Sequence, residues 1–259
     1  MQPQLIVINS KDRASGTATN FGYVMKYYGT NSVDGFRINK ISVPFSWYTI
    51  QSQSFEFIYD NISYTINVLP GQWTAVQLAA QLKSETDALI GINSVNWIWN
   101  QGANTFTVSS LNPAKLFSFN FFAGTYPTNY YYNIGVQMGF ATPATLSGYK
   151  PNLTGTNSFT SLYAVNLTGG ANIYIKSQSL QLYITSFFNK IPDNVIQSVP
   201  VSVAPSDFIV WQNTIETIFA TNSSRPMSTF DFQLVDEYNT PLDLRGLDWT
   251  LELQIFYKF

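Results

Sequence analysis

The residues that most often carry enzyme chemistry are missing from this sequence. The chain has no histidine and no cysteine. Nucleophiles activated by histidine, the usual zinc sites and histidine-bound metals of the oxygenase type are therefore excluded. Disulfides and thiolate chemistry are excluded for the same reason. The pair Gly169–Gly170 has neither the strand-to-helix setting nor the following lysine of a phosphate-binding loop.

Carboxylates are the remaining candidates for catalysis, because a glycosidase needs only two of them. Six gather late in the chain, at Asp231, Asp236, Glu237, Asp243, Asp248 and Glu252. All six fall on alternating strand positions or in turns, so a structural role explains them without catalysis. We expect no enzyme activity, no cofactor and no metal site.

Aromatic side chains could bind a partner, because rings stack on sugars and anchor contacts between subunits. They make up 16% of the chain. Those in or beside expected loops are Trp97, Trp99, Tyr130, Tyr131 and Tyr132, with the runs Phe117–Phe122 and Phe187–Phe188. Three interpretations stay open for them: a glycan platform, an inter-subunit contact, or ordinary filling of a core.

The chain carries unusually little charge. Charged residues make up 11% of it, against roughly 25% in ordinary soluble domains. This composition favours either a secreted or adhesive domain covered in polar uncharged residues, or a subunit that hides much of its surface in an assembly. The net charge of −2, with lysine and arginine spread thinly, predicts no direct contact with nucleic acid.

Targeting and membrane segments are not expected. No apolar run reaches the length of about 18 residues that a membrane-spanning helix needs. The start at Met1–Gln4 lacks a basic region followed by an apolar run, so we expect no secretory signal and synthesis in a cytosol.

The clearest element is a strand at the end of the chain. From Leu251 to Phe259 apolar residues alternate with polar ones, which is the period of a half-buried strand. An apolar row that reaches the last residue must be held in a sheet, because untied termini fray. We predict that this strand is buried within a sheet and that the preceding turn closes the fold. The residues of this fold-closing motif are Pro241, Leu242, Asp243, Gly246, Asp248 and Trp249.

A hairpin and a helix are predicted in the middle of the chain. Alternating apolar residues flank Asp60–Asn61, a dipeptide that tolerates the left-handed backbone of a two-residue turn. Thr74 and Gln77 have the spacing of a capping box before a helix. The apolar stripe of that helix is Ala75, Leu78, Ala79 and Leu82. With the strand-like runs that follow, residues 53–122 could form an inserted layer of hairpin, helix and hairpin.

Strand patterns occupy both flanks of this block. The run Leu5–Ser10 predicts a well-buried first strand, and a shift of the apolar row near Lys40 predicts a bulge. The other expected strands are Phe21–Tyr28, Phe36–Ile50, Leu162–Leu167, Ile173–Ile175, Leu180–Ser186, Val195–Val203, Glu216–Ala220 and Met227–Val235. Residues 126–159 are rich in turn formers and are predicted as long loops. The pattern predicts an all-β, mostly antiparallel fold: one jelly-roll β-sandwich over residues 1–259 with one short helix.

Four motifs taken together resemble a known family. They are Ile6–Arg13, Ile41–Ile50, Leu69–Leu78 and Pro241–Trp249. In sequence and in order along the chain they resemble the penton and minor capsid proteins of virophages, Polinton-like viruses and related large DNA viruses. The resemblance covers both ends of the chain, about half of its length, and makes Pro241–Trp249 a counterpart of the amino-terminal motif.

The resemblance implies a structural virion protein. Such a subunit is a single jelly roll that forms pentamers at the five-fold vertices of an icosahedral capsid, beside double jelly-roll major capsid trimers. It would be located in the virion and assembled in the host cytoplasm or a virus factory. Its partners would be further copies of itself and the major capsid protein, with a host receptor or glycan as an additional partner.

Two alternatives remain at this stage. One is another minor capsid position, such as a trimeric glue protein. The other is a carbohydrate- or receptor-binding β-sandwich that uses Tyr130–Tyr132, Trp97 or Trp99. The mass of the oligomer distinguishes five copies from three, and glycan binding tests the second alternative.

Overall fold

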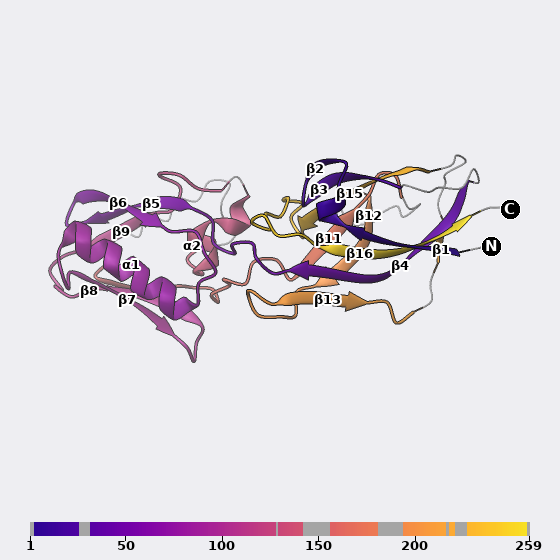
Figure 1. Cartoon of the computed structure of the whole chain (residues 1–259). Coiled ribbons are helices and arrows are strands. Elements are labelled where there is room, and N and C mark those ends of the chain that lie inside the picture. Colours follow the sequence, from indigo (N-terminus) through magenta and orange to yellow (C-terminus); the bar gives the residue numbers. More distant parts are fainter. Residues whose placement is uncertain are drawn as a thin grey trace. The chain divides into compact units, whose positions relative to one another are not determined.

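The chain forms two compact units, here called unit 1 and unit 2. The computed structural model describes residues 3–25, 32–127, 129–141, 156–180, 194–215, 218–220 and 227–257. Unit 1 joins Met1–Trp47 to Gly170–Phe259, and unit 2 is the intervening segment Tyr48–Gly169. Both consist mainly of antiparallel strands (Figure 1), which confirms the predicted all-β class. Unit 2 encloses the range 53–122.

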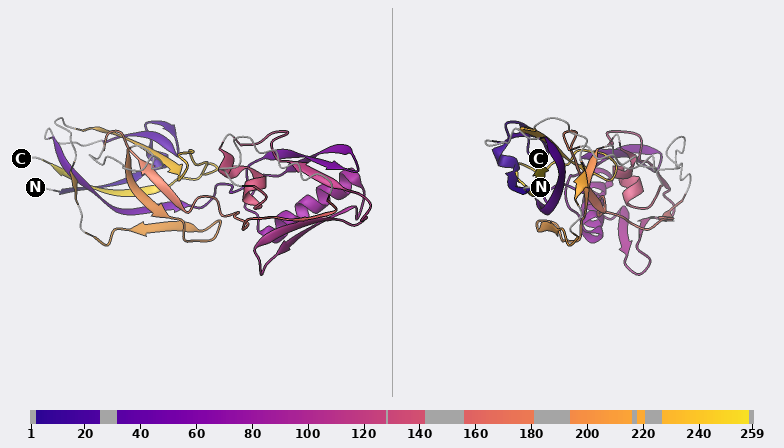
Figure 2. Two further views of the ribbon diagram at one scale, coloured as in Figure 1. Left: turned by 180° about the vertical axis from the view of Figure 1, so that it is seen from behind. Right: turned by 90° about the vertical axis from the view of Figure 1, so that its right-hand side faces the viewer.

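Unit 1 contains two five-stranded sheets. The first comprises β1 (Pro3–Asn9), β16 (Thr250–Tyr257), β4 (Val33–Pro44), β13 (Phe208–Gln212) and β14 (Phe219–Ala220). The second comprises β12 (Val195–Pro200), β11 (Asn172–Lys176), β15 (Thr229–Asp236), β3 (Asn20–Val24) and β2 (Ser15–Thr17). A short 3₁₀ helix, η1 (Ser10–Asp12), follows β1. The sheets are seen from two further directions in Figure 2.

The strand order of unit 1 is that of a jelly roll. Without the short β2 and β14, its strands can be numbered 1 to 8 along the chain, as β1, β3, β4, β11, β12, β13, β15 and β16. Strand 1 pairs with 8, 2 with 7, 3 with 6 and 4 with 5, all antiparallel. The two sheets then have the orders 1-8-3-6 and 5-4-7-2. This is one folded ribbon wound into two sheets, and it confirms the predicted jelly roll.

The terminal strand lies inside the first sheet. β16 pairs with β1 on one side and with β4 on the other, as the alternation predicted. Leu251, Leu253 and Ile255 are completely buried. Opposite β16, Glu252 faces Lys40 and Leu253 faces Ile38, so Asn39 is the extra residue of a bulge. The bulge predicted near Lys40 is therefore confirmed.

Unit 2 contains two three-stranded sheets and a long helix. One sheet comprises β6 (Ile62–Val68), β5 (Gln53–Tyr59) and β9 (Phe117–Asn120), and the other β10 (Ser158–Thr160), β8 (Thr105–Ser110) and β7 (Val95–Asn100). The helix α1 (Ala75–Ile90) contacts β7 and β6 (Figure 1). Two short elements follow β9, the 3₁₀ helix η2 (Tyr130–Tyr132) and α2 (Ile134–Gln137).

Local sequence signals explain the hairpin and the helix of unit 2. Asp60 and Asn61 have φ values of 54° and 66°, as a two-residue turn between β5 and β6 requires. The Thr74 side chain accepts a hydrogen bond from the backbone N–H of Gln77, and the Gln77 side chain accepts one from the backbone N–H of Thr74. The predicted capping box is thus confirmed, and Leu78, Ala79 and Leu82 of the predicted stripe are buried.

Residues 126–159 were predicted as loops, and their described part is more ordered than that. Ile134, Met138 and Phe140 are buried in the core of unit 2, around the short helix α2. The Asn133 side chain caps this helix by accepting from the backbone N–H of Gly135. Turn-forming residues dominate the composition of this segment. Its few buried apolar residues therefore show neither the helical nor the strand periodicity in the sequence.

Within the described part of the chain, one predicted strand is absent, and the strands β2, β9, β10 and β13 were not predicted. Leu162–Leu167 forms no strand, because its backbone N–H groups are bonded to the end of α2 and the residues after it: Asn166 donates to Gln137 and Tyr163 to Gly139. β13 was missed, because Phe208 and Val210 are apolar on the solvent side and hide the alternation. The strand predicted at Leu180–Ser186, beyond Leu180, and the run Phe187–Phe188 lie outside the described residues.

Candidate functional site

The carboxylates at the end of the chain hold turns. The Asp236 side chain accepts hydrogen bonds from the backbone N–H groups of Tyr238 and Thr240, both 2.8 Å long. The Asp243 side chain accepts from the backbone N–H of Arg245, also at 2.8 Å. These are the local bonds by which aspartate stabilises a turn. They give each carboxylate a structural role.

Asp231 has a similar role at a longer range. Its carboxylate accepts hydrogen bonds from the backbone N–H groups of Gln178 and Ser179, at 2.8 and 2.7 Å. Burial by itself would raise the pKa of Asp231, but hydrogen bonds from Ser179 and from these backbone groups outweigh it and lower the pKa. The ionised side chain therefore ties the segment after β11 to β15.

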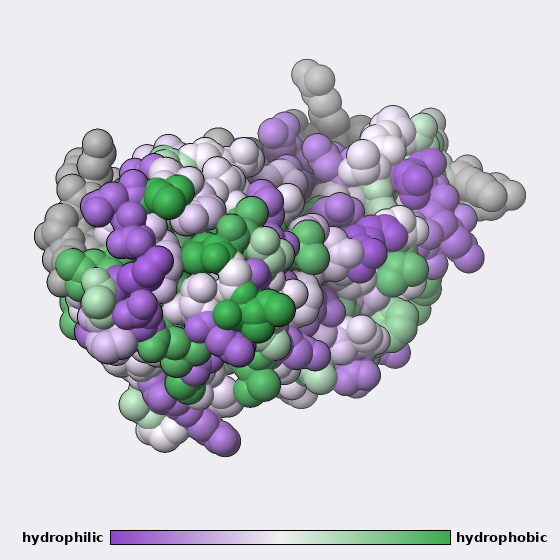
Figure 3. Space-filling model, turned by 90° about the vertical axis from the view of Figure 1, so that its left-hand side faces the viewer, coloured by the Kyte–Doolittle hydropathy of each residue, from purple (hydrophilic) through white to green (hydrophobic). Residues whose placement is uncertain are grey.

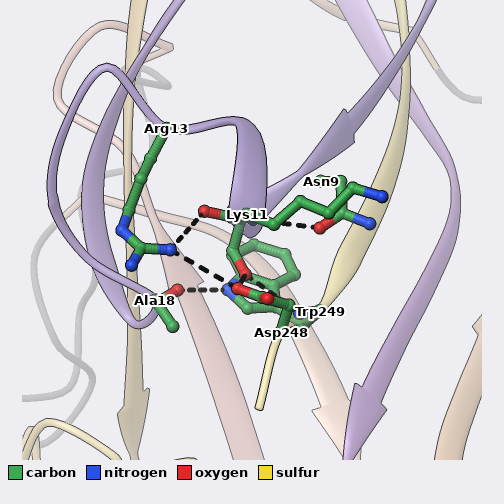
Figure 4. A network of polar contacts seen from close by, with 7 residues as sticks. Asn9, Lys11, Arg13, Ala18, Asp248 and Trp249 are labelled. Atoms are coloured by element: carbon green, nitrogen blue, oxygen red, sulfur yellow. Dashed lines mark hydrogen bonds and ion pairs between the residues drawn. The ribbon is translucent and has the colours of Figure 1, made fainter. Parts of the chain in front are cut away.

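The two ends of unit 1 meet at Ser10. Its side chain is completely buried and its hydroxyl donates a 2.7 Å hydrogen bond to Oδ1 of Asp248. The Ser10 hydroxyl oxygen also accepts a hydrogen bond from the backbone N–H of Trp249, and the Ser10 backbone N–H donates to the Trp249 carbonyl. Nη1 of Arg13 lies 2.9 Å from the Ser10 carbonyl and 3.5 Å from Asp248 (Figure 4). We call Ser10, Arg13, Asp248 and Trp249 the end junction.

Trp249 fixes the junction to the core. Its ring is 1% exposed and packs edge-on against Phe21 and Phe232. Its Nε1 donates a 2.7 Å hydrogen bond to the carbonyl of Ala18 (Figure 4). A buried tryptophan whose N–H is satisfied contributes both packing and position.

The rest of the fold-closing motif forms a tight turn. Pro241 bridges to Val235, and the backbone N–H of Leu242 donates to the carbonyl of Leu234. Leu242 is buried, whereas Asp243 is exposed. Gly246 has a φ of 80°, a left-handed conformation that glycine adopts without strain. The motif thus runs from β15, which Pro241 and Leu242 contact, to the end of β1, where Asp248 and Trp249 bind Ser10.

The predicted aromatic residues do not form one site. Trp97 is 4% exposed and packs against Phe55 and Phe119 in the core of unit 2, so its ring offers no surface to a ligand. Tyr132 is also buried, at 6%. Trp99 is partly buried, and its Nε1 donates to the Asn104 side chain at 3.3 Å.

Tyr130 and Tyr131 do reach the surface. They are 44% and 39% exposed, and Tyr126 is 38% exposed. The ring of Phe122 lies edge-on to both Tyr126 and Tyr130, at centroid distances of 5.6 and 6.4 Å. These rings form an exposed aromatic group beside η2.

Exposed aliphatic residues gather in the loops at one end of unit 2. Ile62, Ile92, Leu111 and Leu116 are each at least 46% exposed; Ile62 is the first residue of β6, and the other three lie in connections between elements. A 3.0 Å ion pair between Lys115 and Asp60 holds two of these loops together, and Asp60 raises the pKa of Lys115. Figure 3 shows hydrophobic groups separated by polar ones on the face that it presents.

Unit 1 exposes apolar residues along its first sheet, and sequence reasoning missed them. Leu5 and Val7 on β1 are 57% and 61% exposed, so the prediction of a well-buried first strand holds only for Ile6 and Ile8. On β13, at the other border of the same sheet, Phe208 is also exposed, at 59%. An unbroken apolar run in an edge strand was the available signal, since one face of such a strand must meet solvent or a partner.

Within the described ranges, no three acidic side chains are grouped so that they could hold a metal ion. Across that same part of the chain, no helix combines the length and apolar character needed to cross a bilayer.

The solved structures that are similar to this chain include one of mavirus and one of the Sputnik virophage. A penton protein of mavirus matches over 100% of this chain and 100% of its own, with 11% sequence identity and a TM-score of 0.48. A cryo-EM structure of the Sputnik virophage matches over 99% of this chain and 98% of that chain, with 12% identity and a TM-score of 0.44. No family model and no curated protein matches the chain.

Proposed function

We propose that the chain is a structural subunit of an icosahedral capsid, where it forms pentamers at the five-fold vertices. The protein then acts by assembly alone: one copy binds the next through a head-to-tail interface, and the ring closes after five copies. The outer rim contacts trimers of the major capsid protein. Its place is the virion, and no turnover is involved.

The jelly-roll strand order of unit 1 is the observation that carries this proposal. Eight-stranded jelly rolls of two Greek keys occur in viral capsid proteins, lectins and cupins. Cupin chemistry uses histidine-bound metals, and this chain has no histidine. Capsid and lectin functions therefore remain as the candidates that this fold supports.

Composition and surface favour the capsid over the lectin. Charged residues make up 11% of the chain and aromatic residues 16%. Interface cores are depleted in charge and enriched in aromatic residues, so a subunit with several neighbours has this composition. Unit 1 exposes aliphatic residues on β1, and unit 2 exposes them in its end loops.

The mass of the purified protein in solution tests the proposal. We expect a species of five chains by native mass spectrometry, and density for the protein at the vertices of particles formed with its major capsid protein. A three-chain species located between trimers would instead indicate a glue position. A protein that stays monomeric at every concentration and does not join particles would refute a capsid role.

Glycan binding is a second candidate function, favoured by the exposed aromatic group at Phe122, Tyr126, Tyr130 and Tyr131. Rings exposed beside one another are suited to stacking on sugars. Tyr130→Ala and Tyr131→Ala should abolish saturable binding of a hit from a glycan array. Tyr163→Ala, at a 44% exposed position outside this group, is the matched control. An array without hits would remove this candidate and leave the capsid proposal unaffected.

A further inference from the structure

The first sheet of unit 1 has two open edges. Among the described residues, β1 pairs only with β16, and β13 pairs only with β4. The outer backbone groups of β1 and β13 therefore have no strand partner within the described ranges. Such edges are templates for pairing with another chain.

Neither edge carries a charged side chain, and the first residue of β1, Pro3, is the one proline in the two strands. Soluble proteins keep exposed edges apart with charged side chains, bulges or very short strands. β1 reads Pro-Gln-Leu-Ile-Val-Ile-Asn and β13 reads Phe-Ile-Val-Trp-Gln, so neither strand contains a charged residue. Both strands are regular in their pairing with the sheet. Their sequences are those of strands that another strand covers.

The side chains at the two edges match in kind. Leu5 and Val7 of β1 are 57% and 61% exposed, and Phe208 and Val210 of β13 are 59% and 58% exposed. Next to β13 the same border of the sheet carries Ile215, which is 70% exposed. Each edge thus presents apolar side chains two residues apart, on the face of the sheet turned away from the core.

The backbone directions match as well. The backbone N–H of Ser10 donates to Trp249, which precedes β16. Because backbone groups alternate in direction along a strand, the N–H and C=O groups of Ile8 and Ile6 also face β16, and those of Leu5 and Val7 face outward. On the other border, the backbone N–H of Asn213 donates to Asn39 of β4. By the same alternation, the backbone N–H and C=O groups of Phe208 and Val210 face away from β4. The residues with exposed apolar side chains are therefore those with free backbone groups.

We propose that β1 of one copy of this chain pairs antiparallel with β13 of the next, with Leu5 opposite Val210 and Val7 opposite Phe208. The proposal rests on the proposed capsid function and names the surface of its head-to-tail interface. Successive strands in the order β1, β16, β4, β13 are antiparallel. A following copy of β1 continues this alternation, so the sheet extends from one subunit into its neighbour.

A second copy is favoured over another partner because the two edges complement each other. A heterologous interface needs two different matching surfaces on the same chain. The borders of one sheet supply them, with opposite strand direction and with the same apolar spacing. An unrelated strand would need to match only one border, and would leave the similarity of the two unexplained.

Substitutions at opposed positions test the interface. Leu5→Lys and Val210→Lys each place a charge in the contact, and each should reduce the oligomer to monomers in native mass spectrometry. Mixing these two variants should give dimers that do not grow, because only one intact junction can form. The double variant Leu5→Lys with Val210→Glu should regain the wild-type mass, since the opposed side chains then form an ion pair. Val76→Lys, at a 60% exposed position of α1, is the control and should leave the mass unchanged.

Hydrogen exchange provides a second measurement that needs no variant. The backbone N–H groups of Leu5, Val7, Phe208 and Val210 should exchange quickly in dilute monomer and lose that fast exchange on assembly. Circular dichroism establishes that each variant is folded before its mass is interpreted.

Three results would overturn the proposed pairing. The first is that both single variants keep the wild-type oligomer mass and that the four edge N–H groups still exchange quickly in the assembled protein. This result would leave the proposed vertex function unaffected. The second is a mixture of the two variants that yields no dimers, which means that β1 and β13 do not contact each other. The third is a wild-type chain that does not associate with itself, in which case recovery in capsid particles decides the vertex function separately.

Discussion

Ser10 and Asp248 lie 238 positions apart in the chain, and their side chains share a 2.7 Å hydrogen bond. The contact joins the turn after β1 to the turn before β16, which are neighbouring strands of one sheet. Since Ser10 also accepts from Trp249, one buried hydroxyl serves both ends of unit 1.

Ser10→Ala should therefore lower the free energy of unfolding by about 1–3 kcal/mol, because the buried Trp249 N–H loses its acceptor. Urea unfolding measures this change. Ser63→Ala is the matched control, since the Ser63 hydroxyl bonds to Glu56 on an exposed surface and a change below about 0.5 kcal/mol is expected there. Equal effects of the two substitutions would contradict the role assigned to Ser10.

Removal of the terminal strand should abolish folding of unit 1. A chain truncated after Thr250 loses the buried residues Leu251, Leu253 and Ile255. Burial of each such side chain is worth about 1.5–3 kcal/mol, against a total stability of about 5–15 kcal/mol. We expect loss of soluble protein or of the dispersed NMR signals of unit 1. A truncated chain that folds and assembles normally would show that β16 is dispensable.

Asp231 should make stability depend on pH in the acid range. Its pKa is lowered in the folded state from the ordinary value of 3.8, so its contribution is present above that value. The contribution is lost as the pH falls through the lowered folded pKa. Unfolding measured over this range should show a steeper loss of stability in the wild type than in Asp231→Asn. Parallel curves for the two proteins would refute the assignment.

Asn61 should tolerate glycine and resist a β-branched residue. Its φ of 66° lies in the left-handed region, where a side chain costs roughly 1–2 kcal/mol and asparagine is one of the better tolerated residues. Asn61→Val should lower the midpoint of thermal unfolding, whereas Asn61→Gly should preserve it. The same midpoint for both variants would mean that the turn between β5 and β6 adopts another conformation.

Local features of this fold could be predicted from the sequence. The turn at Asp60–Asn61 and the capping box at Thr74 depend on residues within a few positions of one another. The terminal strand was recognised because one of its faces is buried while Glu252 and Gln254 remain polar. In each case the residues that determine the structure are close together in the chain.

Features that depend on distant segments could not be predicted in the same way. The sequence suggested that the two end motifs belong together, but not that Ser10 and Asp248 touch, because nothing local encodes that pairing. β13 was missed and β1 was assigned as wholly buried for one physical reason. Apolar residues on both faces remove the alternation that separates core from surface, as Phe208 and Leu5 show.

The central position of β16 also determines when unit 1 can fold during synthesis. The ribosome makes the chain from the amino terminus, and β16 is the last of the strands to emerge. Until then β1 and β4 lack the strand that lies between them. Unit 2 is one continuous segment, so its strands all emerge well before β16. The jelly roll can therefore complete its folding only after β16 has been translated. Until then the apolar strand β1 has no strand partner and is at risk of aggregation.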